Sequence, residues 1–422
     1  MLGKRLNRKT LLIDAPIKSV RPRRQSLFLS LLLRSGLGNW AFHAVFLMGI
    51  VFLFCSSSPL AMKSEITLTP EQEQKVAKLD SLFKFYHEQG IFNGTVLVAE
   101  AGKVIYQKGF GYANMDTKEK LTPKSVFRLA SVSKQFTAMC VMMLKEQGKL
   151  DYDDEIQKYL PELKDYEGVT IRHLLWHTSG VPDYMDFMPK YFPTDGYLND
   201  DVIKIMAKHH PEREFEPGER FEYSNTGYVM LASIVERVSG VSFVEFIKQN
   251  IFDRIGMSST TIPFGKNQFK EMPNRVRGYD RTEDGGYVDN DYIDYDYDLY
   301  GDGGMFSNVI DLFKWNEALY TEKLVKQETL EEAYKPCVFN DGSIGDYGFG
   351  WFICTVDGNK IVGHSGSWIG FRTYILRDIT NKHCVIILTN IGNRKGTKLY
   401  NACYNILMNK PYLRIISIDE KR

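Results

Sequence analysis

Cysteine is scarce in this sequence, and recognisable metal-binding motifs are missing. None of the six cysteines belongs to a CxxC pair, which excludes zinc-ribbon and thioredoxin-like folds. The sequence contains neither an HExxH nor an HxH cluster, and it shows no internal repeat. We expect the five cysteines that follow Cys55 to be small buried hydrophobic residues, with one disulfide as the alternative.

The chain also has little net charge, because 53 Lys+Arg residues face 52 Asp+Glu residues. This balance conceals a basic start: residues 1–64 hold ten basic residues and one acidic residue, and the rest of the chain carries −8. Phosphate repels an acidic body, so we expect no nucleic-acid partner. With 44% hydrophobic residues the chain is globular, and the charge split predicts two segments with different roles.

The basic start has the parts of an export signal. Residues 40–55 carry no formally charged side chain, basic residues precede them, and small polar residues follow. The stretch is slightly shorter than the ~20 residues that a membrane-spanning helix needs. We expect residues 1–64 to be an export signal or an N-terminal anchor, with membrane association through residues 40–55 and a periplasmic or membrane-anchored body. Cleavage after Ala61, lipid attachment at Cys55 and a later translation start remain alternatives.

The rest of the sequence shows strand patterns near both of its ends and helical patterns between them. Residues 69–72 (TPEQ) match a capping box with proline at the first helical position, which predicts a helix start. Apolar patterning predicts a hairpin, three further strands and a closing helix, at residues 94–100 with 103–107, then 360–362, 373–376 and 384–390, and about 397–408. We expect an α+β domain over residues 65–415, with a sheet built from both chain ends, flanking helices, a mostly helical insert at about residues 120–340, and a tail at residues 416–422.

Ser131 and Lys134 lie three residues apart at the start of an apolar helical stretch. This spacing puts both side chains on one helix face, within reach of each other. A serine hydroxyl becomes a good nucleophile only when a base takes its proton, and a partly desolvated lysine can be that base. The helix N-terminus adds positive potential where negative charge would develop. Taken alone, most matches to S-x-x-K are serines that cap a helix beside a solvated lysine.

Three further segments contain residues that could take part in catalysis or substrate binding. Tyr223 and Asn225 form a Y-x-N tripeptide, with a phenol for proton transfer and an amide for substrate binding. Residues 363–367 (GHSGS), expected at a strand end, would let a substrate lie along the strand edge and use backbone donors. Residues 174–180 (LLWHTSG) lie between helical stretches. Structural roles as a turn, a strand end and a helix C-cap are the respective alternatives.

Two other patterns point elsewhere and are rejected. His173 and His177 are spaced like a metal pair, but the apolar residues between them favour buried packing. The GHSGS run nearly matches the G-x-S-x-G nucleophile elbow, yet Ser367 occupies the last glycine position. Without a strand–elbow–helix context, this run does not indicate an α/β-hydrolase.

S-x-x-K, Y-x-N and H-x-G, in this order and at these separations, resemble the serine β-lactamase and penicillin-binding-protein superfamily. The similarity is to class C and its esterase-like and peptidase-like relatives. The LLWHTSG run and residues 303–312 (GGMFSNVIDL) resemble the same branch. The resemblance spans about residues 75–410 and implies the β-lactamase/transpeptidase-like fold, with no metal or organic cofactor.

The resemblance implies a role for each matching residue. Ser131 would attack a carbonyl and become acylated, Lys134 would take its proton, and Tyr223 would relay a proton to the leaving group. Asn225 would bind a substrate amide or carbonyl. The backbone N–H groups of Ser131 and Ser367 would form the oxyanion hole. Substrate binding would thus involve residues of the Y-x-N and GHSGS segments, namely Asn225, His364, Gly366 and Ser367.

His364 departs from the pattern of lactamases, which usually have lysine at this position. Lysine offers a fixed positive charge to a substrate carboxylate, whereas histidine is mostly neutral at pH 7. This difference disfavours penicillin-like substrates and favours neutral or differently charged acyl donors. A glutamate motif of the class A kind is missing, which gives Tyr223 more weight in deacylation.

Residues 279–302 combine nine acidic residues with six tyrosines. Residues 294–298 (DYDYD) suggest calcium, but Leu299 stands where an EF-hand needs glycine. A solvated loop with half-buried aromatic side chains is one interpretation. The other is a wall that faces the substrate, where tyrosines would suit an amphipathic or aromatic molecule.

Together these features predict a serine acyl-enzyme hydrolase that cleaves an ester, an amide or a D-amino-acid peptide. Its partner would be a small-molecule or peptide acyl substrate. One alternative is an acyltransferase, in which an alcohol or amine intercepts the acyl group on Ser131. The others are a non-catalytic binding protein for cell-wall peptides and a true β-lactamase.

Overall fold

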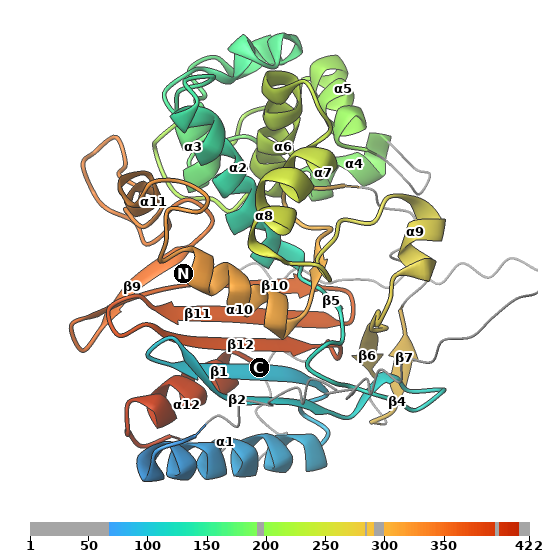
Figure 1. Ribbon diagram of the computed structural model, residues 1–422. Helices are drawn as coiled ribbons and strands as arrows, with labels where there is room; N and C mark the ends of the chain where they lie inside the picture. The colour runs from blue at the N-terminus through green and yellow to red at the C-terminus, as the bar shows by residue number, and fades with distance from the viewer. Residues whose placement is uncertain (1–66, 192–197, 283–284, 291–298, 393–395, 413–422) are drawn as a thin grey trace, which may run out of the picture. The chain divides into compact units, whose positions relative to one another are not determined.

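The computed structural model describes residues 67–191, 198–282, 285–290, 299–392 and 396–412, which all belong to the unit Glu65–Arg422. Its centre is a six-stranded antiparallel sheet in the order β2, β1, β12, β11, β10, β9 (Figure 1). The strands are β1 (Gly94–Glu100), β2 (Lys103–Phe110), β9 (Phe352–Val356), β10 (Asn359–Trp368), β11 (Phe371–Asp378) and β12 (His383–Thr389). The prediction of a sheet built from both chain ends is therefore confirmed.

Both faces of the sheet are covered, and its side chains alternate between two hydrophobic cores. On β12, Ile386 and Leu388 belong to the core that includes the helical insert, while Val385 and Ile387 belong to the core beneath α1 and α12. This alternation follows from the two-residue period of a strand. Continuous apolar patterning in β12 therefore reflects its position at the middle of the sheet.

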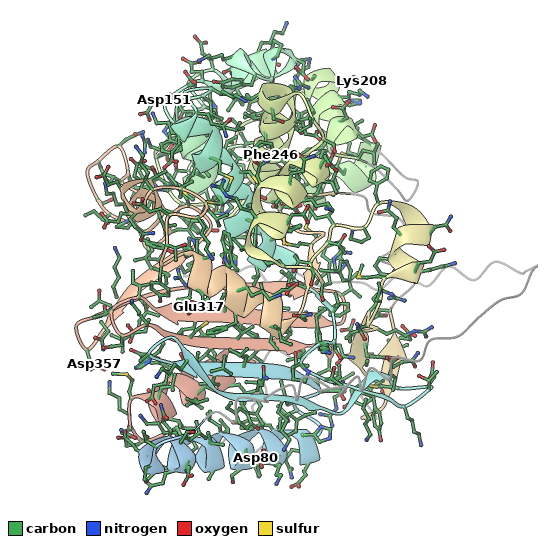
Figure 2. The ribbon with its side chains drawn as sticks, in the orientation of Figure 1. Asp80, Asp151, Lys208, Phe246, Glu317 and Asp357 are labelled. Carbon is green, nitrogen blue, oxygen red and sulfur yellow. The ribbon has the colours of Figure 1, made fainter. Side chains whose placement is uncertain are left out.

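Helices α1 (Pro70–Glu88) and α12 (Gly396–Leu407) pack on one face, and α10 (Val309–Ala318) packs on the other (Figure 1). The predicted capping box at the start of α1 is present. Asp80, labelled on α1 in Figure 2, accepts hydrogen bonds from Tyr106 and Lys108 of β2. The helix that was expected at about residues 397–408 corresponds to α12.

The insert between β2 and β9 is mostly helical, as predicted, and α2 packs against α6 in its interior. Its α-helices are α2 (Lys134–Glu146), α3 (Ile171–Trp176), α4 (Tyr184–Tyr191), α5 (Asn199–His209), α6 (Asn225–Ser239), α7 (Phe243–Ile247), α8 (Asp253–Ile255), α9 (Gly265–Glu271), α10 and α11 (Gln327–Ala333). Shorter turns are η1 (Ala130–Ser133), η2 (Ile156–Lys158), η3 (Pro161–Tyr166) and η4 (Lys248–Phe252). Small strands are β3 (Tyr112–Asn114), β4 (Glu119–Lys120), β5 (Phe127–Arg128), β6 (Tyr279–Arg281), β7 (Tyr287–Asp289) and β8 (Phe306–Ser307).

Strand β10 is longer than the sequence pattern suggested. The strand predicted at residues 360–362 was too short, because pairing with β11 continues to Trp368. Residues 363–367, expected at a strand end, form the C-terminal part of β10. Pairing with β9 stops at Gly363. Among the described residues, one edge of β10 therefore has no strand partner beyond this point. The rest of β10 pairs with β11 alone.

The five described cysteines are free thiols. Four of them are buried, as predicted: Cys140, Cys337, Cys384 and Cys403. Cys354 is exposed, so the prediction was wrong there, because β9 is an edge strand with most of its side chains turned to solvent.

Within the described ranges, no helix is both long and apolar enough to cross a membrane. Residues 40–55, for which membrane association is expected, lie outside these ranges.

Arg377 links the sheet to the helical insert. Its side chain is 0% exposed on β11, and its guanidinium donates to the Asn316 side chain on α10 at 2.7 Å and to the Tyr334 hydroxyl. The aromatic rings of Tyr320 and Trp351 lie 4.8 and 5.6 Å from it. These contacts make a buried charge tolerable through neutral hydrogen-bond acceptors and cation–π contacts.

We expect Arg377→Ala to lower the free energy of unfolding by roughly 3 kcal/mol, because it opens a cavity and leaves buried polar groups without a donor. Urea unfolding followed by circular dichroism measures the change. The exposed Arg254 on α8 is the control, and Arg254→Ala should cost less than about 0.5 kcal/mol. Equal unfolding midpoints for both variants would contradict the role of Arg377.

Candidate active site

A pocket of about 370 Å³ lies between the free edge of β10, the turn before α2 and the start of α6. Ser131, Tyr223, Asn225 and Ser367 line it. Lys134 lies below the pocket surface and is 0% exposed. The structure thus brings together five of the residues that the sequence analysis selected.

Lys134 is the first residue of α2, directly after the 3₁₀ turn η1 that carries Ser131. Its Nζ atom donates to Ser131 Oγ at 3.2 Å, to Asn225 Oδ1 at 2.8 Å and to the main-chain oxygen of Asp302 at 2.9 Å. An ammonium group has three donors, so this buried charge is fully hydrogen-bonded. In its neutral form the same amine can accept the proton of Ser131.

The turn before Ser131 is held from several sides. Ala130 has a φ of +49°, a left-handed conformation that costs energy for a residue with a side chain. The carbonyl of Leu129 accepts a hydrogen bond from Thr373 Oγ1 at 2.6 Å. A Cβ atom at Gly366 would lie 2.1 Å from that carbonyl, so only glycine permits this approach. Gly366, predicted to bind substrate, does not line the pocket and instead lets β10 pack against the turn.

Tyr223 lines the pocket, and its hydroxyl oxygen is buried. The centroid of its ring lies 4.8 Å from Lys134 Nζ. The ring also packs against His177, with 4.2 Å between the two ring centroids. Among the described residues, its hydroxyl has no hydrogen-bond partner. A phenol placed in this way can exchange a proton with a bound substrate or water.

The two residues expected to supply oxyanion donors, Ser131 and Ser367, line the same pocket. Ser367 lies on the part of β10 that pairs with β11 but not with β9. An oxyanion hole needs backbone N–H groups aimed at one point, and placement of both residues on one pocket is compatible with this requirement.

His364 is only 5% exposed and does not line the pocket. Its Nδ1 atom lies 2.6 Å from the carbonyl of Ser365, and its Nε2 atom lies 3.0 Å from the Tyr347 hydroxyl. A carbonyl can only accept, so Nδ1 carries the proton and Nε2 accepts from Tyr347. Both ring nitrogens are therefore engaged within the protein, although the sequence analysis expected a substrate contact. Burial and the charge of Lys134 lower the pKa of His364 to about 3, so the ring is neutral at pH 7.

His177 packs in the interior, as predicted. It ends α3 with a φ of +58°, and its Nδ1 atom accepts a hydrogen bond from the Ser224 N–H at 3.2 Å. Burial places the pKa of His177 well below its ordinary value. His173 instead belongs to the capping box with Thr170. In the part of the chain that the structure describes, no group of three or more His, Cys, Asp or Glu residues could hold a metal ion.

Asp183 is an acidic residue of the site that was not predicted from the sequence, whereas Asp302 belongs to the segment at residues 279–302 that was interpreted as a possible wall of the site. Asp183 Oδ2 accepts hydrogen bonds from both the backbone and the side-chain nitrogen of Asn225, at 2.7 and 2.9 Å. Asp302 lines the pocket, and its carboxylate accepts from the Tyr184 hydroxyl at 3.0 Å. Asp183 follows the LLWHTSG run by three residues, and this proximity was the only feature of the sequence that could have indicated a role for Asp183 in the site.

The acidic, tyrosine-rich segment contributes to the pocket at its end. Leu299 and Asp302 line the wall. Tyr279 and Tyr300 bond instead to Met115 and Glu236, and no described tyrosine of this segment lines the pocket. The calcium-like residues 294–298 lie outside the described ranges.

The buried imidazole of His364 should make stability depend on pH. Its pKa of about 3 lies below the 6.5 of an unperturbed histidine, so protonation favours the unfolded chain. This contribution is intact above pH 6.5 and falls by about 1.4 kcal/mol per unit as the pH drops toward 3. We expect His364→Gln to show a shallower loss of stability between about pH 6 and 4 in urea unfolding. The exposed His209 is the control, and His209→Gln should keep the wild-type slope. An unchanged slope in His364→Gln would contradict this assignment.

Comparison with known proteins agrees with this geometry. A family model described as Beta-lactamase matches residues 74–402. Penicillin-binding protein 4* of Bacillus subtilis (strain 168) is 37% identical over 359 residues, which are 81% of this chain and 78% of that protein.

Two solved structures extend the comparison. An octameric penicillin-binding protein homologue from Pyrococcus abyssi is 31% identical, with a TM-score of 0.71 and coverage of 79% of this chain and 78% of that one. A D-amino acid amidase from Ochrobactrum anthropi SV3 shares the fold at 23% identity, with a TM-score of 0.66 and coverage of 80% and 99%. The family match, the curated relative and the fold agree with the S-x-x-K and Y-x-N residues gathered at the pocket, and the chain belongs to the β-lactamase family, among its penicillin-binding-protein-like serine hydrolases.

Proposed function

We propose that this chain is a serine acyl-enzyme hydrolase that cleaves an ester, an amide or a D-amino-acid peptide through acylation of Ser131. The observation that carries the proposal is the 3.2 Å contact between Lys134 Nζ and Ser131 Oγ at the floor of an open pocket. A buried lysine beside a serine supplies the base that the hydroxyl lacks.

In the acylation step, neutral Lys134 accepts the proton of Ser131, and Oγ forms a bond to the substrate carbonyl carbon. The N–H groups of Ser131 and Ser367 stabilise the oxyanion of the tetrahedral intermediate. That intermediate collapses as the bond to the leaving group breaks, and Tyr223 donates a proton to the leaving atom. Water then attacks the acyl carbon and passes a proton to the Tyr223 phenolate. The bond to Ser131 Oγ breaks, Lys134 returns its proton to Oγ, and the acid and free Ser131 are released.

The lining of the pocket favours acyl donors that are neutral and partly apolar. Tyr184, Met185, Leu299 and Trp368 supply aromatic and aliphatic surface. The neutral His364 ring lies outside the lining, so position 364 offers no cation to a substrate carboxylate.

The pocket does contain one cation, Arg128, which stacks on the Trp368 ring at 4.9 Å and is 6% exposed. Asp302 also lines the pocket, and its carboxylate would repel the carboxylate of a penicillin. Penicillin hydrolysis as the main role is therefore disfavoured.

Acyl transfer is the second candidate. Once Tyr223 has given its proton to the leaving group, its phenolate can deprotonate an alcohol as well as a water molecule, so either acceptor would remove the acyl group from Ser131. We further propose that residues 1–64 export or anchor this activity, because they combine basic residues with an uncharged apolar stretch.

Ser131→Ala should abolish covalent labelling by a fluorophosphonate probe and reduce ester hydrolysis to background, because it removes the proposed nucleophile. Mass spectrometry of the digested adduct places the label. Ser133 is the control, since it lies in the same turn and is buried, and Ser133→Ala should still be labelled. The mechanism would be contradicted by a label on any residue other than Ser131. It would also be contradicted if the wild type showed neither labelling nor ester hydrolysis.

A substrate screen separates hydrolysis, acyl transfer and β-lactamase activity. We expect faster turnover of p-nitrophenyl esters than of nitrocefin, because position 364 presents no cation to the β-lactam carboxylate. Adding an alcohol acceptor and analysing the products by mass spectrometry shows whether a new ester forms. Preferential nitrocefin turnover would overturn the substrate assignment, and a predominance of the new ester would favour acyl transfer.

A further inference from the structure

We propose that Asp183 is a positioning residue for the acylation of Ser131, because its carboxylate sets the orientation of the Asn225 amide that holds Lys134. The inference rests on the proposed function above. It concerns a residue that contacts neither Ser131 nor Lys134 through a hydrogen bond of its own, and that therefore acts through Asn225.

An asparagine amide has two different ends, and which of them faces Lys134 decides whether the contact is attractive. Asp183 Oδ2 lies 2.9 Å from Asn225 Nδ2, and an ionised carboxylate can only accept hydrogen bonds. The amide nitrogen must therefore face Asp183. The amide oxygen consequently faces Lys134, whose Nζ atom donates to it at 2.8 Å. With the amide reversed, its NH₂ group would meet the ammonium group, donor against donor.

Asp183 also fixes the backbone on which Asn225 sits. Its Oδ2 atom accepts from the Asn225 N–H at 2.7 Å, at the first residue of α6. The residue that precedes the helix, Ser224, makes no capping hydrogen bond with its side chain. A carboxylate from a segment 42 residues earlier thus caps this helix end, where negative charge is favourable.

The segment that carries Asp183 is itself tied to α6. The Tyr184 N–H donates to Thr226 Oγ1 at 2.6 Å, and that hydroxyl donates to the carbonyl of Pro182 at 2.8 Å. The Met185 N–H donates to the other carboxylate oxygen of Asp183 at 3.0 Å. Both oxygens are therefore held, and the carboxylate has one defined direction.

An ionised Asp183 side chain at this position carries an unfavourable free energy of desolvation. Burial raises the pKa of Asp183, and the neighbouring charge of Asp302 acts in the same direction, although the Asn225 and Met185 N–H groups and Lys134 oppose them. A neutral residue would avoid this cost of burial. The carboxylate of Asp183 near Ser131 and Lys134 is therefore explained by its orientation of Asn225, and not by a gain in the free energy of unfolding.

The test compares Asp183→Ala with Asp186→Ala, an exposed aspartate three residues later, in the helix α4 that begins directly after Asp183. We expect Asp183→Ala to lower kcat for a p-nitrophenyl ester by roughly 10- to 100-fold, as for the loss of a hydrogen bond to a charged group, with KM changed by less than about twofold. Fluorophosphonate labelling of Ser131 should slow by the same factor. Asp186→Ala should leave both rates unchanged. Asp183→Asn keeps an acceptor and should recover activity to within about fivefold of wild type.

A double-mutant cycle with Asn225→Ala separates positioning from a general structural effect. If Asp183 acts through Asn225, Asp183→Ala should cost less than about threefold further once Asn225 is alanine. The same loss in both backgrounds, or a change confined to KM, would overturn the inference. If Asp183→Ala does not fold, Asp183→Asn carries the same comparison, and its smaller loss must likewise vanish. A wild type that is not labelled at Ser131 overturns the proposed function and the inference with it, whereas equal labelling of the wild type and Asp183→Ala overturns the inference alone.

Discussion

The buried ammonium group of Lys134 is the constraint on which the rest of the site depends. A charge that is 0% exposed must be fully hydrogen-bonded, and its three acceptors come from the turn before α2, the start of α6 and the main chain at residue 302. These segments lie far apart in the sequence. The hydrogen bonds to this one charge therefore bring Ser131, the Y-x-N tripeptide and the pocket wall at Gly303 and Gly304 to one place.

The same charge shapes what surrounds it. His177 and His364 are both buried near Lys134, and burial together with this positive neighbour lowers the pKa of each. Their rings remain neutral and pack with Tyr223 and Tyr347 as an aromatic layer behind the pocket. A second cation is thereby kept away from Tyr223, and the proposed preference for neutral acyl donors rests on the same arrangement.

Local patterns in the sequence were enough to predict five of the six strands of the sheet and the helices α1 and α12, because capping boxes and strand alternation depend on neighbouring residues. The edge strand β9 was not predicted. The S-x-x-K and Y-x-N residues, with Ser367, were also predicted, since the family resemblance fixes their order. His364 and Gly366 were placed less well, because His364 is held in the interior by Tyr347 and the Ser365 carbonyl, and Gly366 packs against the carbonyl of Leu129. Asp183 was missed because its partner, Asn225, lies 42 residues away, and a single sequence carries no record of such a contact.

The two carboxylates near Lys134 are both held one step away from its nitrogen. Asp183 reaches it only through the Asn225 amide, and Asp302 offers its main-chain oxygen while its side chain accepts from Tyr184. A carboxylate in direct contact would stabilise the ammonium form strongly. Neutral acceptors satisfy the same donors with less electrostatic stabilisation, as they do for Arg377 elsewhere in the fold. At Lys134, a hydroxyl oxygen, an amide oxygen and a main-chain oxygen together accept hydrogen bonds from the buried amine.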